Sequence, residues 1–331
     1  MNIGITYDLR DEYLAEGYGE METAEFDRAD TIQAIEGALL QLGHEVCCIG
    51  NIRSLVGCLA EGECWDMVFN IAEGLAGFGR EAQIPALLEA YRIPYTFSDP
   101  LVLSLSLHKG MAKHIVRSLS IPTPDFVILD APEDISKVKL PFPLFAKPVA
   151  EGTGKGIDAA SKINSQEELE QVCERIFEMN RQPVIIEAYL PGREFTVGIA
   201  GTGKDAVALG VAEIFLKDHA EQNAYSYVNK ERCEELVEYR LVYDLEAEKA
   251  KESAIAVWRG LGCRDAGRVD LRSDISGLPN FMEVNPLSGL HPHHSDLPIL
   301  CNMKGIAYGH LIGMIIDSAC RRFNGAAGDA Q

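Results

Sequence analysis

Short β-rich runs alternate with helical segments at the start of the chain. The β-rich runs span residues 2–7, 46–49 and 67–71. The helical segments, with apolar residues at helical spacing, span residues 31–42 and 83–91. Strands that alternate with helices favour a parallel sheet covered on both faces. The sequence therefore predicts an α/β unit in this part of the chain.

A turn-rich boundary at Ile121-Pro122-Thr123-Pro124 opens a different pattern, because two prolines remove backbone donors and disfavour helix before them. The strands expected beyond it span residues 142–147, 183–189, 195–200, 207–214, 267–271 and 280–283. The helices expected there span residues 165–180, 245–261 and 305–322. Together with the first unit, this pattern predicts a mixed fold that combines α/β and α+β parts.

Charge and cysteine usage exclude several classes of protein. The 331 residues include 30 Lys+Arg and 50 Asp+Glu, a formal net charge of −20, which disfavours nucleic-acid partners. No uninterrupted apolar run reaches the roughly 18 residues of a membrane span, and no signal-peptide pattern follows Met1. We therefore expect a cytoplasmic protein without a membrane partner. The nine cysteines are scattered and form no C-x-x-C pair, so we interpret them as reduced thiols.

A glycine-rich segment follows a strand of the second module. Glu151-Gly152-Thr153-Gly154-Lys155-Gly156 comes just after the strand that ends at Lys147. Backbone amides of such a loop can close over phosphate oxygens, and a lysine at the strand end suits a polyphosphate. A flexible hairpin turn explains the glycines equally well, because the segment matches neither common phosphate-loop motif.

Two strand segments near the end of the chain carry polar side chains at alternate positions. On paired strands, the period of two would send Arg268 and Asp270 to one face, and Glu283 and Asn285 likewise to one face. Two carboxylates and an amide then converge, and such oxygen donors suit a hard cation such as Mg²⁺ or Mn²⁺. The alternative is a sheet face with ordinary salt bridges around Arg268.

The residues at the end of the strand at 183–189 and just after it can bind a purine nucleoside. Glu187, Tyr189 and Leu190 combine an acid, an aromatic ring and an aliphatic side chain, and Glu194 can accept hydrogen bonds from ribose hydroxyls. The alternative is that all four are core and surface residues.

The stretch His291-Pro292-His293-His294 raises the possibility of zinc. Pro292 breaks helical spacing, however, and only Asp296 stands at a ligand interval. We interpret the stretch as shaping a substrate pocket beside the metal site.

Six segments in a fixed order suggest a family. They are Pro94-Tyr95-Thr96-Phe97-Ser98-Asp99, Leu107-His108-Lys109, Ala146-Lys147-Pro148 with Glu151-Gly152, residues 186–197, Gly267-Arg268-Val269-Asp270 and Glu283-Val284-Asn285-Pro286. With these segments the chain resembles the D-alanine:D-alanine ligases of the ATP-grasp superfamily over nearly its whole length.

The resemblance implies an ATP-grasp fold with an N-terminal parallel-sheet (pre-ATP-grasp) domain. Residues 1–107 would form the N-terminal substrate domain and residues 108–193 a central subdomain with the phosphate loop. Residues 194–323 would form a C-terminal domain with the metal and acceptor sites, and we expect a disordered tail at 324–331. A homodimer is expected because relatives commonly form one.

The resemblance also implies an ATP- and Mg²⁺-dependent reaction in which a carboxylate is phosphorylated and an amine attacks the acyl phosphate. The products would be a dipeptide, ADP and phosphate. The implied ATP contacts are Lys109, Lys147, Glu151, Gly152, Thr153, Gly154, Glu187, Tyr189, Leu190 and Glu194, and the implied metal ligands are Asp270, Glu283 and Asn285. The implied catalytic groups are Arg268 and the Gly289 backbone as oxyanion donors, Lys230 on a mobile loop with Tyr225 and Tyr227, and Thr153.

The chain departs from the family pattern where the first amino acid would bind. A His-Gly pair is replaced by Glu73-Gly74, a Gly-Glu-Asp-Gly segment by Gly79-Arg80-Glu81-Ala82, and the tyrosine after the loop lysine by Glu231. The residues expected at the substrates are Glu25, Glu73, Arg80, Ser288, Leu290 and Ser295. A buried carboxylate is costly without a donor, so Glu73 needs either Arg80 or an amino group of the substrate.

Three interpretations follow. The first is a D-alanine–D-alanine ligase-like enzyme acting on small amino acids, with peptidoglycan synthesis as one setting. The second is an ATP-grasp ligase that joins a different amino-acid or peptide pair in a biosynthetic pathway. The third is a nucleotide-binding protein without catalysis, which the combination of Arg268 with the metal-site residues disfavours. The role of residues 10–30, as a lid or a solvated loop, stays open.

Overall fold

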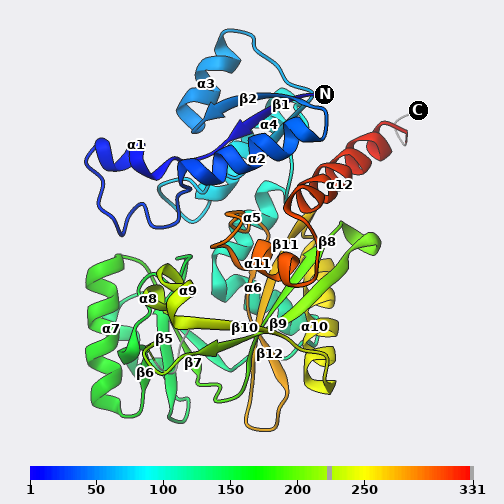
Figure 1. Ribbon diagram of the computed structural model, residues 1–331. Helices are drawn as coiled ribbons and strands as arrows, with labels where there is room; N and C mark the ends of the chain where they lie inside the picture. Colours follow the sequence, from blue (N-terminus) through cyan, green and yellow to red (C-terminus); the bar gives the residue numbers. More distant parts are fainter. Residues whose placement is uncertain (222–225, 329–331) are drawn as a thin grey trace.

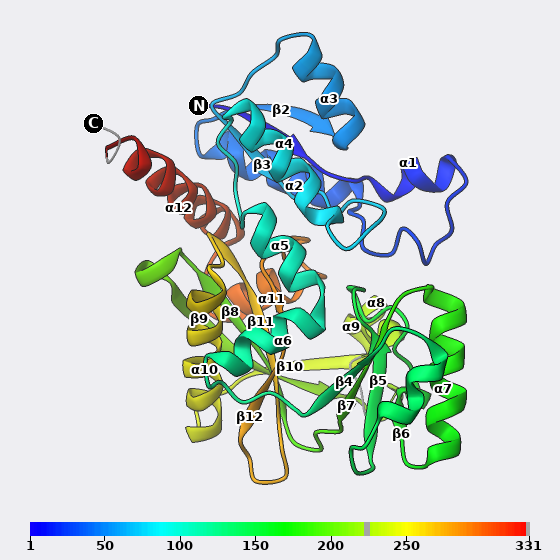
Figure 2. The same ribbon diagram turned by 180° about the vertical axis from the view of Figure 1, so that it is seen from behind.

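Three β-sheets organise the computed structural model of the protein, which describes residues 1–221 and 226–328, with side chains through Phe323 (Figures 1 and 2). The first unit comprises β1 (Asn2–Thr6), α1 (Arg10–Ala15), α2 (Ala29–Gln41), β2 (Glu45–Gly50), α3 (Ile52–Ala60), β3 (Met67–Asn70), a 3₁₀ turn (Arg80–Ala82) and α4 (Gln83–Tyr91). Its strands run parallel, as predicted, and their order in the sheet is β2-β1-β3.

Alternating side chains of this parallel sheet pack on opposite layers. Ile3, Ile5 and Phe69 lie in one core with α2, whereas Val68 lies in another with α3 and α4. The predicted cover on both faces is therefore confirmed, and the period of two along each strand is its physical cause.

Two helices connect this unit to the rest of the chain: α5 (Pro100–Leu107) and α6 (Lys109–Ser118). The four-stranded sheet that follows has the order β4-β7-β5-β6 and is antiparallel. It comprises β4 (Phe126–Leu129), β5 (Leu144–Pro148), β6 (Lys162–Ile163) and β7 (Val184–Ala188), with α7 (Gln166–Asn180) between β6 and β7. Short 3₁₀ turns span Pro132–Lys137 and Ala159–Ser161. The Ser165 hydroxyl accepts a hydrogen bond from the Glu168 amide at 3.2 Å and so caps the start of α7.

A five-stranded antiparallel sheet, ordered β10-β9-β8-β11-β12, forms the third unit. Its elements are β8 (Glu194–Ala200), a 3₁₀ turn (Gly203–Asp205), β9 (Val207–Leu216), α8 (Tyr227–Glu231), α9 (Cys233–Leu236), β10 (Val237–Leu241), α10 (Leu245–Leu261), β11 (Ala266–Ser273), β12 (Pro279–Asn285), α11 (Asp296–Met303) and α12 (Tyr308–Gly328). Trp258 of α10 is fully buried in the core on one face, and Val116 of α6 lies in the same core. Although α6 lies within residues 108–193, it therefore packs with the five-stranded sheet.

The closing helix joins the two ends of the chain. Leu311 and Ile315 of α12 share the core of Ile3 and Ile35, so the helix lies beside α2 (Figure 1). It continues to Gly328, past Arg322 where its end was expected. Residues 324–328 were expected to form a disordered tail, but they continue α12. The earlier turns of this helix are packed in the core, and adding residues to an existing helix is easier than starting one. Residues 329–331 lie outside the described part of the chain.

No single described helix is long and apolar enough to cross a membrane. Within the described residues, one pair of helices, α11 and the first part of α12 (Tyr308–Phe323), meets the length and composition test together, and the two helices are bent by 114° relative to each other. All nine cysteines are free thiols.

Candidate active site

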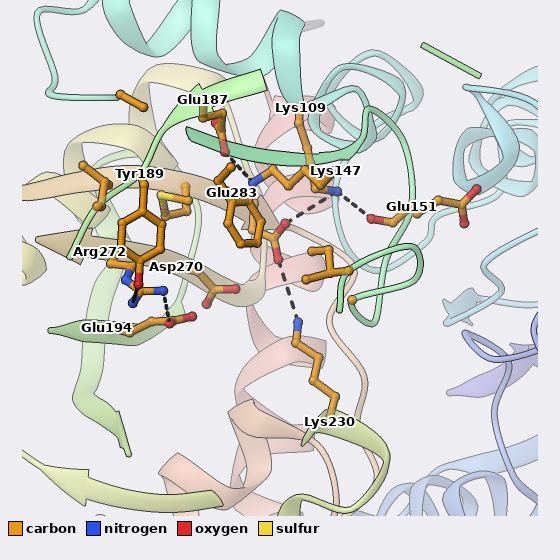
Figure 3. A pocket seen from close by; sticks show the side chains of 16 residues that line it. Lys109, Lys147, Glu151, Glu187, Tyr189, Glu194, Lys230, Asp270, Arg272 and Glu283 are labelled. Atoms are coloured by element: carbon orange, nitrogen blue, oxygen red, sulfur yellow. Dashed lines mark hydrogen bonds and ion pairs between the residues drawn. The ribbon is translucent and has the colours of Figure 1, made fainter. Parts of the chain in front are cut away.

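A pocket lies between the two antiparallel sheets. Strands β5 and β7 provide one side, β8, β11 and β12 provide the other, and α6 and α8 add Lys109 and Lys230 (Figure 3). Its lining includes the expected nucleotide contacts Lys109, Lys147, Glu151, Gly154, Glu187, Tyr189, Leu190 and Glu194. Sequence segments far apart in the chain thus meet at one crevice.

Glu187 of β7 is held between two lysines at the inner end of the pocket. The Lys147 Nζ lies 2.9 Å from its Oε2, and the Lys113 Nζ lies 2.7 Å from its Oε1. All three side chains are buried. Burial would raise the pKa of Glu187, but the two ammonium groups outweigh it and leave that pKa below its ordinary value. The carboxylate therefore stays ionised and fixes both lysines.

Lys113 was missed in the sequence. Burial lowers its pKa to about 8, although Glu187 opposes the shift. Its position four residues after Lys109 on α6 was the available signal, because such residues lie on the same face of a helix.

Glu283 of β12 lies between two further lysines. Its Oε2 is 3.5 Å from the Lys109 Nζ, and its Oε1 is 3.9 Å from the Lys230 Nζ (Figure 3). The Lys109 Nζ also donates a hydrogen bond of 2.5 Å to the Glu151 carbonyl oxygen. Burial raises the pKa of Glu283, but the opposing effect of Lys109 and Lys230 is larger, so the net shift of this pKa is downward. This carboxylate is ionised at neutral pH.

The register of β11 and β12 brings the three predicted metal ligands and Arg268 together. Asp270 lies opposite Glu283, and Arg268 lies opposite Asn285. The Asp270 Oδ2 contacts the Arg268 guanidinium and accepts a 3.4 Å hydrogen bond from the Asn285 amide. Its Oδ1 accepts one of 2.8 Å from the Thr196 hydroxyl. Burial raises the pKa of Asp270 despite the guanidinium. These oxygen donors can hold a hard cation.

The outer end of the pocket is a slot with an aromatic wall. The rings of Phe145 and Tyr189 stack at 6.5 Å between centroids. Arg272 lies over the Tyr189 ring at 5.2 Å and pairs with Glu194 at 3.3 Å. Sequence reasoning missed Phe145 and Arg272, although the period of two on β11 puts Arg272 on the face of Asp270. An aromatic wall beside charged groups suits a flat ring with polar edges.

The glycine-rich loop lies against the segment that carries Lys230. Gly154 has a φ of +73°, and a Cβ there would lie 2.8 Å from the Tyr227 amide nitrogen. A glycine is therefore required where the loop meets α8.

Two further residues were expected near Lys230. Tyr225 lies outside the described residues. Glu231 lies 3.7 Å from the Arg10 guanidinium of α1, so the segment at 10–30 contacts α8.

A second cavity adjoins the first through Lys109, Glu151 and Glu283, which line both. Its other predicted residues are Glu25, Glu73, Gly152, Thr153, Arg268, Asn285, Ser288 and Gly289. Leu290 and Ser295 were expected to contact substrate and do not line it. Leu290 is buried in the core shared with Ile3, because the chain turns inward after Gly289, and the Ser295 hydroxyl accepts a hydrogen bond from the His291 amide at 3.0 Å.

Arg80 pairs with Glu25 rather than with Glu73. The Arg80 Nη2 lies 2.7 Å from the Glu25 Oε2, and its Nη1 donates to the Ala150 carbonyl oxygen at 3.0 Å. Gly74, with a φ of +72°, allows this packing, since a Cβ there would lie 2.5 Å from the Arg80 carbonyl oxygen. The Glu25 Oε1 accepts from the Gly152 amide at 2.7 Å. The acid and the glycine loop are thus joined.

Glu73 and Glu81 line the same cavity without a basic partner of their own. Among the residues the structure describes, neither carboxylate makes a hydrogen bond or an ion pair. Burial and the neighbouring Glu81 raise the pKa of Glu73, and burial raises that of Glu81 to about 7. This end of the cavity favours a positively charged group.

Comparisons with known proteins identify the family of the chain. A family model described as the D-ala D-ala ligase C-terminus matches residues 115–317. A D-alanine–D-alanine ligase of Aquifex aeolicus is 32% identical over 288 residues, which cover 86% of this chain and 93% of that protein. The uncharacterized protein y4sG of Sinorhizobium fredii is 31% identical over 311 residues, with 90% and 88% covered.

Two solved structures share the fold. The D-alanine–D-alanine ligase of Bacillus anthracis complexed with ATP has a TM-score of 0.74 at 22% identity and covers 98% of this chain and 99% of that chain. The VanG D-Ala:D-Ser ligase of Enterococcus faecalis has a TM-score of 0.72 at 20% identity, with 96% and 99% covered. The chain therefore belongs to the D-alanine–D-alanine ligase family and is an ATP-dependent ligase of the ATP-grasp fold that forms a dipeptide.

Proposed function

We propose that the first pocket binds ATP and that the adjoining cavity holds the carboxylate that ATP phosphorylates. The observation that supports this most is the convergence of Lys109, Lys147 and Lys230 on one crevice of a chain with a net charge of −20. A polyphosphate is the ligand that such a cluster of ammonium groups attracts. The slot of Phe145 and Tyr189 beside it fits the adenine ring.

Mg²⁺ or Mn²⁺ fits the donors on β11 and β12. The Asn285 amide nitrogen donates to Asp270, which leaves the Asn285 Oδ1 as an acceptor. Glu283 is kept ionised by Lys109 and Lys230. Asp270, Glu283 and Asn285 would hold the ion, and when bound it would neutralise phosphate charge.

Arg268 and Gly289 stand where the acyl group would react. Both line the second cavity, and the Arg268 guanidinium is oriented by Asp270 and by Asp296, whose Oδ2 lies 3.5 Å away. We assign Arg268 and the Gly289 amide to the oxyanion of the tetrahedral intermediate. Lys230 on α8 and Thr153 on the glycine-rich loop, which meets α8 at Gly154, would close over the phosphates and exclude water from the acyl phosphate.

The first substrate carries a cationic side chain in addition to its α-ammonium group and the carboxylate that reacts. Arg80 is committed to Glu25, so the alternative in which Arg80 neutralises Glu73 is not supported by the contacts. Glu73 and Glu81 then favour an ammonium or guanidinium group of the substrate. D-alanine alone, with one small apolar side chain, should be a poor first substrate.

A screen of amino-acid pairs for ADP release, with mass spectrometry of the products, tests these assignments. We expect dipeptides from pairs with a basic first amino acid, and a shift toward D-alanine in Glu73→His. Efficient D-alanyl-D-alanine synthesis by the unmodified protein would overturn the cationic first substrate. Normal turnover in Arg268→Ala would overturn the assignment of the second cavity to the reacting acyl group.

A further inference from the structure

The histidine stretch at 291–294 links two parts of the molecule that lie on opposite sides of it. The His291 Nε2 lies 3.2 Å from the Asp30 Oδ2 in the first turn of α2. The His294 Nδ1 lies 3.6 Å from the Cys233 Sγ and 3.5 Å from the Glu234 Oε1, both on α9. Cys233 and His294 are 61 residues apart, so their spacing in the sequence does not indicate that they meet. Folding alone brings the thiol to the imidazole.

The separations match those of ligands around one metal ion. Zinc binds sulfur at about 2.3 Å and nitrogen or oxygen at about 2.0–2.2 Å, so tetrahedral geometry separates S from N by about 3.6 Å and N from O by about 3.4 Å. The observed distances from the His294 Nδ1 are 3.6 Å to sulfur and 3.5 Å to oxygen. All three donor atoms lie within 4.8 Å of one another. One ion can reach them with little movement.

The three side chains differ in their exposure to solvent. Cys233 is 1% exposed, His294 is partly buried, and the Glu234 side chain is 63% exposed. The group is therefore closed toward the protein and open toward solvent at Glu234, which gives an ion a path of entry and room for a water ligand. The Cys233 thiol also contacts the His294 carbonyl oxygen at 3.7 Å and hydrogen-bonds with the Tyr239 side chain.

We propose that Cys233, Glu234 and His294 bind a thiophilic divalent cation such as Zn²⁺, with water as the fourth ligand. Thiolate and imidazole ligands select such metals, whereas the oxygen donors of Asp270 and Glu283 select Mg²⁺. The two sites are therefore chemically distinct. The new site does not depend on which amino acids the enzyme joins.

The site would fasten α8 and α9 to the loop that follows Gly289. Lys230 lies on α8, immediately before α9, and its ammonium faces Glu283. The His291 contact with Asp30 continues the connection to α2. A bound ion would thus restrain the segment that carries Lys230. We expect Zn²⁺ to reduce amide hydrogen exchange in residues 226–236.

The test uses the full chain, freed of metals by a chelator and then saturated with Mg²⁺ and ATP so that the oxygen-donor site is occupied. Co²⁺ should produce a thiolate-to-metal charge-transfer band, and Zn²⁺ should bind with one-to-one stoichiometry by calorimetry. Loss of an outer-shell partner weakens metal sites about 10–100-fold, so loss of a direct ligand in Cys233→Ser or His294→Ala should weaken binding at least about 100-fold.

Matched controls are Cys64→Ser and His293→Ala, which remove an exposed thiol and an exposed imidazole outside the group. Both should keep the affinity and the charge-transfer band of the unmodified protein. Glu234→Gln changes an exposed side chain and keeps the test valid should Cys233→Ser fail to fold. Equal Zn²⁺ affinity in all variants, or a Co²⁺ spectrum without the thiolate band, would overturn the site.

Discussion

Asp270 and Glu283 lie directly opposite each other on the antiparallel strands β11 and β12. Each carboxylate meets a different set of cations: Asp270 contacts Arg268 from its own strand, and Glu283 lies between Lys109 of α6 and Lys230 of α8. The strand pair therefore fixes the two acids, while three other positions of the chain set their charge. This arrangement leads to the first prediction.

Replacement of either acid should abolish turnover and leave the fold intact. Asp270→Asn or Glu283→Gln keeps the side-chain shape and removes one negative charge from the proposed cation site. ADP release at saturating Mg²⁺ measures activity, and circular dichroism checks the fold. Glu252→Gln, an exposed change on α10, is the control. Near-normal turnover in either site variant would exclude the proposed cation site.

Lys147→Ala should weaken ATP binding far more than amino-acid binding. One charge-assisted contact contributes about 1.5–3 kcal/mol, which corresponds to roughly 10- to 150-fold in affinity. Glu187 keeps Lys113 as a partner, so the variant should fold. Calorimetry with a non-hydrolysed ATP analogue measures the loss, and Lys137→Ala, at an exposed lysine, should show none. An unchanged nucleotide affinity would contradict the role of Lys147.

Lys113→Met should destabilise the protein without a direct effect on the phosphates. Removal of one partner from a buried ion pair costs about 3–5 kcal/mol, and the remaining pair of Glu187 with Lys147 should keep the loss near about 3 kcal/mol. Urea unfolding measures this loss, with Lys137→Met as control. If the free energy of unfolding stayed unchanged, the buried ion pairs of Glu187 with Lys113 and Lys147 would not stabilise the fold.

Glu81 should make the stability of the protein depend on pH. Burial raises its pKa from 4.5 to about 7 in the folded protein. The stabilising contribution of the protonated group is complete below pH 4.5 and is lost as the pH rises to 7, because the unfolded chain releases its proton first. Glu81→Gln should remove this decline and raise the free energy of unfolding above pH 7, by on the order of 3 kcal/mol.

Urea unfolding at several pH values tests this prediction, with Glu252→Gln as the exposed control. Identical pH profiles for Glu81→Gln and the unmodified protein would mean that Glu81 is already ionised in the folded state. A cationic first substrate should also bind more tightly as the pH rises through 7 and Glu81 ionises, and Glu81→Gln should lose this gain.

Local pattern was enough to predict much of this molecule. Periodicity predicted the parallel first unit and the strand pair β11–β12, because burial of one face forces a period of two on a strand and of 3.6 on a helix. The same period put Asp270 near Glu283. The order of the motifs from Pro94 to Pro286 indicated the family, which the comparisons confirm.

Contacts between distant segments were decided only by the tertiary structure. The choice of Glu25 over Glu73 as the partner of Arg80 depends on the path of the loop at Gly74, and local sequence contains no record of that path. Lys113 is similar: its helix predicts a face, but only packing against β7 determines that Glu187 meets it. The sequence by itself determined the elements and the chemical groups available, since both depend on near neighbours. The pairing of charges across the cavities, and of Cys233 with His294, followed only from packing, because Coulomb energies depend on separation in space and not along the chain.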